Sequence, residues 1–385
     1  MNSDDRILVL ADDLTGALEV GAKWGSRGVR TSVTTEMNLS DCEGITAIQA
    51  MVIDSETRHL GSGEAAARVS AWAGSAHQNG FSRVYKKTDS TLRGNIASEL
   101  AALLKAWPDS PLLYVPAYPK MGRTVRGGTL YVHGVPVGET EFADDELNPV
   151  RESSIPAMIR SQCSVPVFSI AYDAVERADS SAIYVCDSET DEQVAQAARA
   201  FARSDKLRLA AGPAAFAASL ADHMTPSQPS PALPRNLRNG LVVSGSRNKV
   251  SKEQLRHAAQ NGFVAAAPAE IPQILEKGGW AILELTDRSS DTADDFAGRA
   301  GKIVRELLAQ KKPDALVVFG GDTAYAIIRE LGRPSIRPLG EVLEGIPVSS
   351  IEAGLGSAGL FLITKAGGFG PPDILISMRK IVSGE

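Results

Sequence analysis

The sequence has few of the residues that build metal sites and disulfide frameworks. Its three cysteines, Cys42, Cys163 and Cys186, lie far apart and form no CxxC pair. The five histidines show neither HxxxH nor HxH spacing, so a structural zinc site is not expected. An odd number of widely spaced thiols is typical of a reducing compartment. We therefore expect a cytoplasmic protein.

Long apolar runs and an excess of basic charge are also missing. No stretch approaches the roughly 20 apolar residues that a membrane span requires, and no apolar signal core precedes the first strand pattern. No membrane partner is therefore expected. The net charge of −6 argues against nucleic acid as a partner, since nucleic acid usually recruits a basic surface. A local basic site for a small anion remains compatible with this charge balance.

Length and pattern indicate two α/β domains with mostly parallel sheets. A chain of 385 residues exceeds the size at which one core usually stops growing. Apolar strand patterns alternate with helix patterns, which is typical of right-handed βαβ units. Four prolines fall within residues 225–234 and disfavour regular structure there. We predict domains over residues 1–224 and 240–385, with a linker over residues 225–239.

The stretch Lys86–Asn95 concentrates charge between a strand pattern and a helix pattern. It contains Lys86, Lys87 and Arg93, the carboxylate of Asp89 and three hydroxyl groups. The helix pattern that follows places an apolar stripe from Ile96 to Trp107 on one face. Three neighbouring cations repel one another unless an anion lies among them. The stretch therefore predicts a turn that holds an anionic small molecule.

Two other turns carry the same kind of residues. Asp12 and Asp13 follow the apolar run 7–11, and the stretch Asp54–Arg58 follows the run 50–53. The carboxyl ends of parallel strands line the ligand crevice of open α/β sheets, so one shared site is the favoured interpretation. Arg58 and Arg93 suit a carboxylate ligand, and an aspartate could act as base toward a hydroxyl. The alternative is that the aspartates only cap helices.

The second half offers glycine-rich turns after strands. They are Ser244–Ser246, Gly320–Thr323 and Gly367–Gly370. Backbone N–H groups in such turns can hold phosphates without cationic side chains, although any single turn can be purely structural. No Walker loop is present, and the GxGxxG match at residues 354–359 precedes a strand, which is the wrong context for a dinucleotide site. Together with the anion site, this favours a two-domain phosphotransferase whose closure would exclude water.

Residues 122–149 interrupt the strand and helix rhythm. Glycine pairs, short β-type runs and a cluster of acids suggest a hairpin excursion. Such an excursion can serve as a flap or as a subunit interface, and the same composition also fits a structureless surface loop. We treat the segment as the candidate contact of a homo-oligomer.

Three blocks resemble the four-carbon acid sugar kinase family. They are Asp12–Ala17, Asp54–Arg58 and Lys87–Asn95. The resemblance spans nearly the whole chain, including the 122–138 hairpin and the Lys365–Gly370 stretch. It implies an N-terminal acid-sugar-binding domain, a C-terminal ATP-binding domain and phosphorylation of a C4 hydroxyl. Mg²⁺ is expected as cofactor, because phosphoryl transfer depends on neutralising the charge of the phosphates. Two departures are a somewhat short second domain and Ala366, where the family usually has serine.

The family's functional residues can be carried over to matching positions. The predicted catalytic residues are Asp12 and Asp89. The predicted substrate-binding residues are Asp13, Arg58, Lys87, Ser90 and Arg93. The predicted ATP-binding residues are Ser244, Gly320, Gly321, Asp322, Thr323 and Gly367. No metal ligand can be assigned.

The resulting hypothesis is an ATP-dependent kinase of D-threonate or D-erythronate, with a 3-oxo-tetronate kinase as the alternative. Two interpretations from other classes stay open, a nucleotide-dependent oxidoreductase and a non-catalytic sensor of sugar acids. The oxidoreductase is disfavoured by the lack of a dinucleotide fingerprint after the first strand. The sensor predicts binding without release of ADP.

Overall fold

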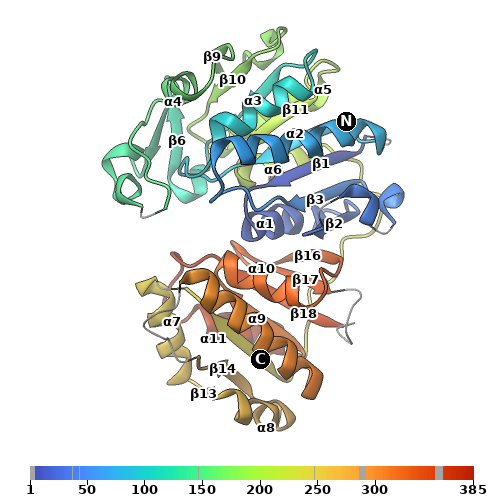
Figure 1. The fold of residues 1–385 in the computed structure, drawn as a ribbon, viewed down its shortest axis with the longest axis vertical. Coiled ribbons are helices and arrows are strands. Elements are labelled where there is room, and N and C mark those ends of the chain that lie inside the picture. Colours follow the sequence, from blue (N-terminus) through green and yellow to red (C-terminus); the bar gives the residue numbers. More distant parts are fainter. Residues whose placement is uncertain are drawn as a thin grey trace. The chain divides into compact units, whose positions relative to one another are not determined.

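A computed structural model describes residues 5–36, 38–42, 44–145, 147–246, 248–285, 292–351 and 359–385. Glu146, Arg247 and residues 354–358 of the GxGxxG match lie outside these ranges. The chain forms two compact units (Figure 1). The first unit comprises Met1–Thr31 and Glu36–Pro229, and the second comprises Ser32–Thr35 and Ser230–Glu385.

The first unit is built on a parallel sheet. In spatial order its strands are β3 (Ala50–Asp54), β1 (Ile7–Ala11), β4 (Arg83–Lys87), β11 (Leu209–Gly212), β5 (Leu112–Tyr114), β10 (Ile183–Asp187) and β9 (Val167–Ala171). Every pairing within this set is parallel. All residues of β1, β3 and β4 are buried. The mostly apolar sequences of β1 and β3 predict this for inner strands, whereas β4 buries three charged residues.

Helices connect these strands. They are α1 (Leu14–Gly25), α2 (Ser62–Gln78), α3 (Ile96–Ala106), α4 (Ile155–Gln162), α5 (Asp191–Arg203) and α6 (Ala214–Ala221). Figure 1 shows α2 and α3 side by side against the sheet. The predicted stripe of α3 is confirmed, since Ile96, Leu100 and Leu103 are buried. Trp107, just after α3, donates its indole N–H to the carbonyl of Ala73 on α2 at 3.0 Å.

The predicted hairpin excursion is present, so the structureless-loop alternative is wrong. Strands β6 (Arg123–Arg126), β7 (Thr129–Val132) and β8 (Val135–Pro136) form a small antiparallel sheet. The backbone N–H groups of Gly127 and Gly128 each donate to the carboxylate of Asp187 at 2.8 Å. This carboxylate lies at the end of β10 and ties the hairpin turn to the main sheet.

The second unit has a mixed sheet. Its parallel strands are β13 (Phe263–Ala266), β14 (Trp280–Leu283), β12 (Gly240–Ser244), β15 (Ala315–Phe319) and β18 (Leu360–Lys365). Antiparallel strands β17 (Ile346–Ile351) and β16 (Ile336–Leu343) follow β18. Val33, from β2 (Thr31–Thr34), pairs with Ile336 of β16. Both units are therefore α/β with mostly parallel strands, and the predicted fold class is confirmed.

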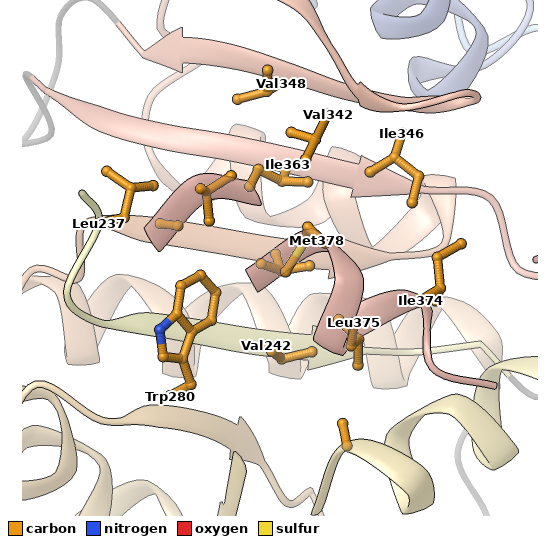
Figure 2. Packing of buried hydrophobic residues seen from close by; sticks show 14 of the residues in the cluster. Leu237, Val242, Trp280, Val342, Ile346, Val348, Ile363, Ile374, Leu375 and Met378 are labelled. Carbon is orange, nitrogen blue, oxygen red and sulfur yellow. The ribbon is translucent and has the colours of Figure 1, made fainter. Parts of the chain in front are cut away.

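The helices of the second unit enclose its apolar core. They are α7 (Lys249–Ala259), α8 (Ile271–Glu276), α9 (Ala293–Gln310), α10 (Gly321–Glu330) and α11 (Ile374–Ser383). Figure 2 shows Leu375 and Met378 of α11 in the cluster of buried apolar side chains that also contains Val242 and Trp280. No helix among the described residues is both long and apolar enough to cross a membrane. Residues 222–239, between α6 and β12, contain no helix or strand.

Candidate active site

The three charged turns of the first unit lie next to one another. Strand β1 pairs with β3 on one side and β4 on the other, with Ala11 opposite both Asp54 and Lys87. All three strands are parallel, so their carboxyl ends meet at one edge of the sheet. The turns after Ala11, Asp54 and Lys87 therefore share that edge.

Arg58 joins two of these turns. Its Nε donates to Asp12 Oδ2 at 2.7 Å, and one terminal nitrogen donates to Asp13 Oδ2 at 2.6 Å. The backbone N–H groups of Thr57 and Arg58 also donate to the carbonyl of Asp12. Burial alone would lower the pKa of Arg58, but the charges of Asp12 and Asp13 outweigh it and raise this pKa well above its usual value. Arg58 thus stays charged and fixed between the two aspartates.

The third turn contains its own ion pair. Arg93 forks onto Asp89, with Nε at 3.2 Å from Oδ1 and a terminal nitrogen at 2.8 Å from Oδ2. Asp89 Oδ1 also accepts the backbone N–H of Thr91 at 2.9 Å. The remaining terminal nitrogen of Arg93 reaches Asp145 Oδ2 at 3.4 Å, from the excursion. Arg93 is therefore held on two sides by protein carboxylates.

A further ion pair lies in the core beneath these turns. Lys86 Nζ lies 3.1 Å from Glu99 Oε2 of α3, and both side chains are almost fully buried. Burial raises the pKa of Glu99, and Lys86 opposes that rise. The sequence signal for this pair is Glu99 itself, a carboxylate on the apolar face of the predicted helix.

These contacts correct the charge argument made from the sequence. Lys86 and Arg93 do not need an external anion, because Glu99, Asp89 and Asp145 already neutralise them. Lys87 differs, since among the described residues no carboxylate oxygen lies within 4.0 Å of its ammonium group and it donates only to the carbonyl of Thr88 at 3.1 Å. Lys87 is also buried. It is the cation of the Lys86–Arg93 stretch that an anionic ligand could still pair with.

The two candidate catalytic aspartates differ in what their oxygens contact. Burial would raise the pKa of Asp89, but Arg93, Arg58 and a hydrogen bond from Thr91 outweigh it and hold this pKa far below its usual value. Burial likewise opposes Arg58, Lys86 and Lys87 at Asp12, whose pKa is also lowered. Within the described residues Asp12 Oδ1 is buried and accepts no hydrogen bond. Asp12 thus retains an oxygen that a ligand hydroxyl could contact.

The helix-capping alternative holds for one of the three aspartates. Asp13 is the N-cap of α1 and accepts the Gly16 N–H at 2.8 Å. Asp12 caps no helix, and α3 starts after Asn95 rather than after Asp89. Asn95 instead donates to the carbonyls of Thr57 and Leu60 at 2.9 and 2.8 Å, which ties two turns together. Asp13 therefore combines capping with its contact to Arg58.

Two further acids at this edge were not singled out from the sequence. Burial, followed by the charge of Glu56, raises the pKa of Asp54 well above its usual value. Its Oδ1 accepts the backbone N–H of Glu56 at 3.2 Å, and Glu56 has a left-handed backbone with φ 45°. Such a residue is rare outside glycine and asparagine and often marks a functional turn. A protonated Asp54 could donate a hydrogen bond at this site.

Ser90 completes the predicted set in the first unit. It is half-buried, and lies between Asp89 and Thr91 in the turn that carries the Arg93 ion pair. The following Leu92 is buried with φ 67°, and Gly94 has φ 90°. The turn is thus wound by left-handed residues, which brings Arg93 back onto Asp89.

The glycine-rich turns of the second unit also share one sheet edge. Strand β15 pairs with β12 and with β18, so that Phe319 lies opposite both Ser244 and Lys365. Gly245 donates its N–H to the carbonyl of Phe319, and Gly320 donates to the carbonyl of Lys365, at 3.3 and 3.1 Å. The turns that carry Ser244, Gly320 and Gly367 are therefore neighbours.

These turns leave little room for side chains. Gly320 has φ 101°, which favours glycine, and Gly321, Asp322 and Thr323 form the first turn of α10. A Cβ at Gly367 would lie 2.6 Å from Ser246 Oγ, and one at Gly245 would overlap the hydroxyl of buried Thr323. Exposed backbone N–H groups at a helix start and in close glycine turns are the usual parts of a phosphate cradle. The arrangement suits the phosphates of a nucleotide.

The fold thus defines a protein with two α/β units, one with a charged side-chain cluster and one with a backbone cradle. Residues 7–220 match the family described as the sugar-binding N-terminal domain, and residues 281–375 match the nucleotide-binding C-terminal domain. The chain belongs to the four-carbon acid sugar kinase family.

Curated relatives match over almost the full length. A D-threonate kinase of Bordetella bronchiseptica is 30% identical, covering 97% of this chain and 96% of the relative. A 3-oxo-tetronate kinase of Cupriavidus necator is 26% identical, with 97% and 96% covered. A crystal structure of a Bordetella bronchiseptica domain of unknown function is 29% identical with a TM-score of 0.53, covering 98% of both chains. It is described as a domain-swapped dimer with bound citrate.

Proposed function

We propose that the protein transfers the γ-phosphoryl group of ATP to the C4 hydroxyl of a four-carbon sugar acid. D-threonate and D-erythronate are the preferred substrates, and a 3-oxo-tetronate is the alternative. The observation that carries the proposal is the edge of β3, β1 and β4. Among the described residues, buried Lys87 has no ion-pair partner there, its charge lowers the pKa of Asp12, and Asp12 Oδ1 accepts no hydrogen bond. Such a cation can pair with the carboxylate of a hydroxy acid, and the aspartate oxygen can accept a hydrogen bond from the hydroxyl group of the same acid. The D-threonate kinase of Bordetella bronchiseptica supports the substrate class.

In this proposal the substrate carboxylate binds to Lys87. It also accepts hydrogen bonds from those N–H groups of Arg58 and Arg93 that do not donate to aspartates. Asp13 and Ser90 line the same turns. Asp12 is the better candidate to orient the attacking hydroxyl, because both oxygens of Asp89 are engaged by Arg93. The low pKa of Asp12 makes it a weak base, which suits positioning rather than early proton removal. Asp89 then acts by holding Arg93.

ATP would bind through Ser244, the α10 start at Gly320–Thr323, and Gly367. Mg²⁺ in phosphoryl transfer is usually held by one or two carboxylates and the nucleotide phosphates. No group of three or more potential ligands is found among the described residues, and exposed Asp322 lies in the first turn of α10. The residues therefore fit a Mg²⁺ ion that is held mainly by phosphates. Bound there, it would neutralise phosphate charge.

The direct test is an ADP-release assay with ATP, Mg²⁺ and a panel of acids. The panel comprises D-threonate, D-erythronate, L-threonate and 3-oxo-tetronates, with phosphorus NMR to locate the phosphate on the product. We expect turnover with one or more of the D-acids and a C4 phosphate ester. Binding of the acids without ADP release would instead favour the sensor. Phosphate on another hydroxyl would contradict the proposed chemistry.

We further propose that residues 122–149 contribute to a homo-oligomer. The excursion exposes Val135 and Leu147, with 41% and 71% of their surface accessible. The related Bordetella bronchiseptica structure is a dimer, which supports association in the family. Light scattering of the wild type and a Val135→Ser, Leu147→Ser variant tests this. An unchanged oligomer in the variant would exclude these side chains from the interface.

A reducing compartment remains our proposal for the location. Among the described residues, neither Cys163 nor Cys186 forms a disulfide. Burial raises the pKa of Cys186 to about 12, so this thiol is unreactive at neutral pH. Fractionation of cells that produce the protein, with an antibody against it, would test the cytoplasmic assignment. Recovery outside the cytoplasm would contradict it.

A further inference from the structure

Lys365 is a buried cation beside the proposed phosphate cradle, and the proposed function assigns it no role. It ends β18, and only 1% of its surface is exposed. Its ammonium lies 4.9 Å from the ring centre of Phe319 and 4.5 Å from that of Phe369. Among the described residues no carboxylate forms an ion pair with it. Burial lowers the pKa of Lys365 to about 8, and it still carries its proton for the most part at neutral pH.

Burying a charge without an opposite charge lowers the stability of the folded state. Hydrogen bonds that the Lys365 ammonium donates offset part of this cost. Lys365 Nζ donates to the carbonyl of Ala366 at 2.8 Å and to that of Gly367 at 3.4 Å. Ser251 Oγ, from α7, donates to the same Gly367 carbonyl at 2.6 Å. Gln254, also on α7, donates to the carbonyls of Phe369 and Gly370 at 3.0 and 2.9 Å. The carbonyl groups of the turn after β18 are thus held from the protein interior.

The direction of these carbonyls determines where the N–H groups point. In a trans peptide the N–H points opposite to the preceding C=O. The N–H groups of Gly367, Gly368 and Gly370 therefore point away from Lys365 and Gln254. Within the part of the chain that the structure describes, none of these three groups donates a hydrogen bond. Successive free N–H groups of this kind form an anion-binding nest.

We propose that Lys365 is a positioning residue for nucleotide phosphates. It holds the carbonyls of residues 366 and 367 inward, so that the N–H groups of the turn face the phosphates. Its charge also adds positive potential behind the nest, since the apolar rings screen it poorly. The two aromatic rings and the buried position keep the ammonium from direct contact with the ligand. This inference rests on the proposed use of ATP.

The test is a binding titration of ATP and AMP, without any sugar acid, to the full chain and to Lys365→Met. Removal of a charged hydrogen-bond donor should weaken ATP binding by roughly ten- to a hundredfold. The loss should be at least several times smaller for AMP, which has one phosphate. The melting temperature should stay equal or rise, because an unpaired buried charge has been removed. Lys252→Met, on the exposed side of α7, is the matched control and should bind ATP normally.

Three results would overturn the proposal. They are ATP affinity within twofold of the wild type, an equal loss for ATP and AMP, and no nucleotide binding by the wild type. If Lys365→Met does not fold, Lys365→Leu decides by the same criteria, since it also removes both the donor to the carbonyls and the charge. A wild type that binds ATP but phosphorylates no acid would overturn the kinase proposal and leave this one standing.

Discussion

The two candidate sites place charge in opposite ways. In the charged turns of the first unit three cations are paired with carboxylates: Arg58 with Asp12 and Asp13, Arg93 with Asp89, and Lys86 with Glu99. In the second unit backbone turns form the cradle. Its buried cation Lys365 donates to two carbonyls and lies against two rings, and no carboxylate among the described residues pairs with it. Paired charges fix side chains in place. A cation without an acid leaves attraction for a polyanion.

The largest expected effect comes from breaking the Arg58 cluster. Arg58→Ala leaves Asp12 and Asp13 without their cation in a mostly buried site. Loss of one partner of a buried pair typically costs about 3–5 kcal/mol of unfolding free energy. Urea unfolding, followed by the fluorescence of the first unit's tryptophans, measures it. Arg27→Ala, which removes a surface pair with Asp222, is the control and should cost less than about 1 kcal/mol. Equal costs would refute the contrast.

Low pH should reduce the unfolding free energy of the first unit, and Asp89 should account for part of this reduction. Its pKa is lowered in the folded state, so its stabilising effect is present above the unfolded pKa, near 4, and is lost as the pH falls below that value. We expect about 2 kcal/mol of the fall in unfolding free energy between pH 5 and pH 2 to depend on this carboxylate. Asp89→Asn should flatten the fall by that amount. A slope that Asp89→Asn leaves unchanged would count against the pair.

Lys365 should act at the other end of the pH scale. Its pKa is about 8 when folded and near 10.5 when unfolded, so the unfolded chain binds the extra proton between these values. Unfolding free energy should therefore rise with pH in that window. Hydrogen exchange of second-unit amides measures this, and Lys365→Met should abolish the dependence. A dependence that persists in the variant would assign it to other groups.

Adding a methyl group to the glycine-rich turn at Gly367 should weaken ATP binding moderately. A methyl group in Gly367→Ala would lie 2.6 Å from Ser246 Oγ and displace the turn. We expect the KM for ATP to rise roughly tenfold, which is about 1.4 kcal/mol, while the KM for the acid stays unchanged. The double variant Gly367→Ala, Ser246→Gly removes the overlap and should recover most of the affinity. Failure of that rescue would mean that the methyl group acts otherwise.

The smallest effect is expected at Asp145. Its contact with Arg93 is long, at 3.4 Å, and both groups are partly exposed. Asp145→Asn keeps the acceptor for the backbone N–H of Asn148 and removes the charge. Thermal unfolding should show a loss of about 0.5 kcal/mol, as for other exposed pairs. A loss as large as that of Arg58→Ala would show that the excursion holds Arg93 more firmly than the geometry indicates.

Much of the fold follows from local pattern. The runs that became β1, β12, β15 and β18 are apolar over at least three residues, which suits inner strands of a parallel sheet. Strand β16 gave no such signal, because Pro338 lies inside it and cannot donate to a ladder. The structure accommodates this proline at a register shift between Pro338 and Gly340. Strand β11 was missed since its Leu-Ala-Ala-Gly sequence is equally compatible with a helix.

The charged turns of the candidate site could be predicted from the sequence, but the ion pairs among their residues could not. Strand ends identify which turns meet, because parallel neighbours share an edge. Which acid neutralises which cation depends on chain packing: Asp145 lies 52 residues beyond Arg93, and Glu99 is on a helix rather than in a turn. Sequence reasoning therefore treated Lys86 and Arg93 as cations that need an external anion, although carboxylates of the chain already pair with both.

The strand segment Ser32–Thr35 affects how the protein can be dissected. It lies in sequence between β1 and β3 of the first unit, yet it belongs to the second, where Val33 pairs with Ile336. A fragment that starts at Ser230 would lack it and expose the edge of β16, and exposed edges recruit other chains. No single cut therefore yields both units whole. A nucleotide-binding fragment for biophysical work would need residues 32–35 grafted onto it, or the full chain.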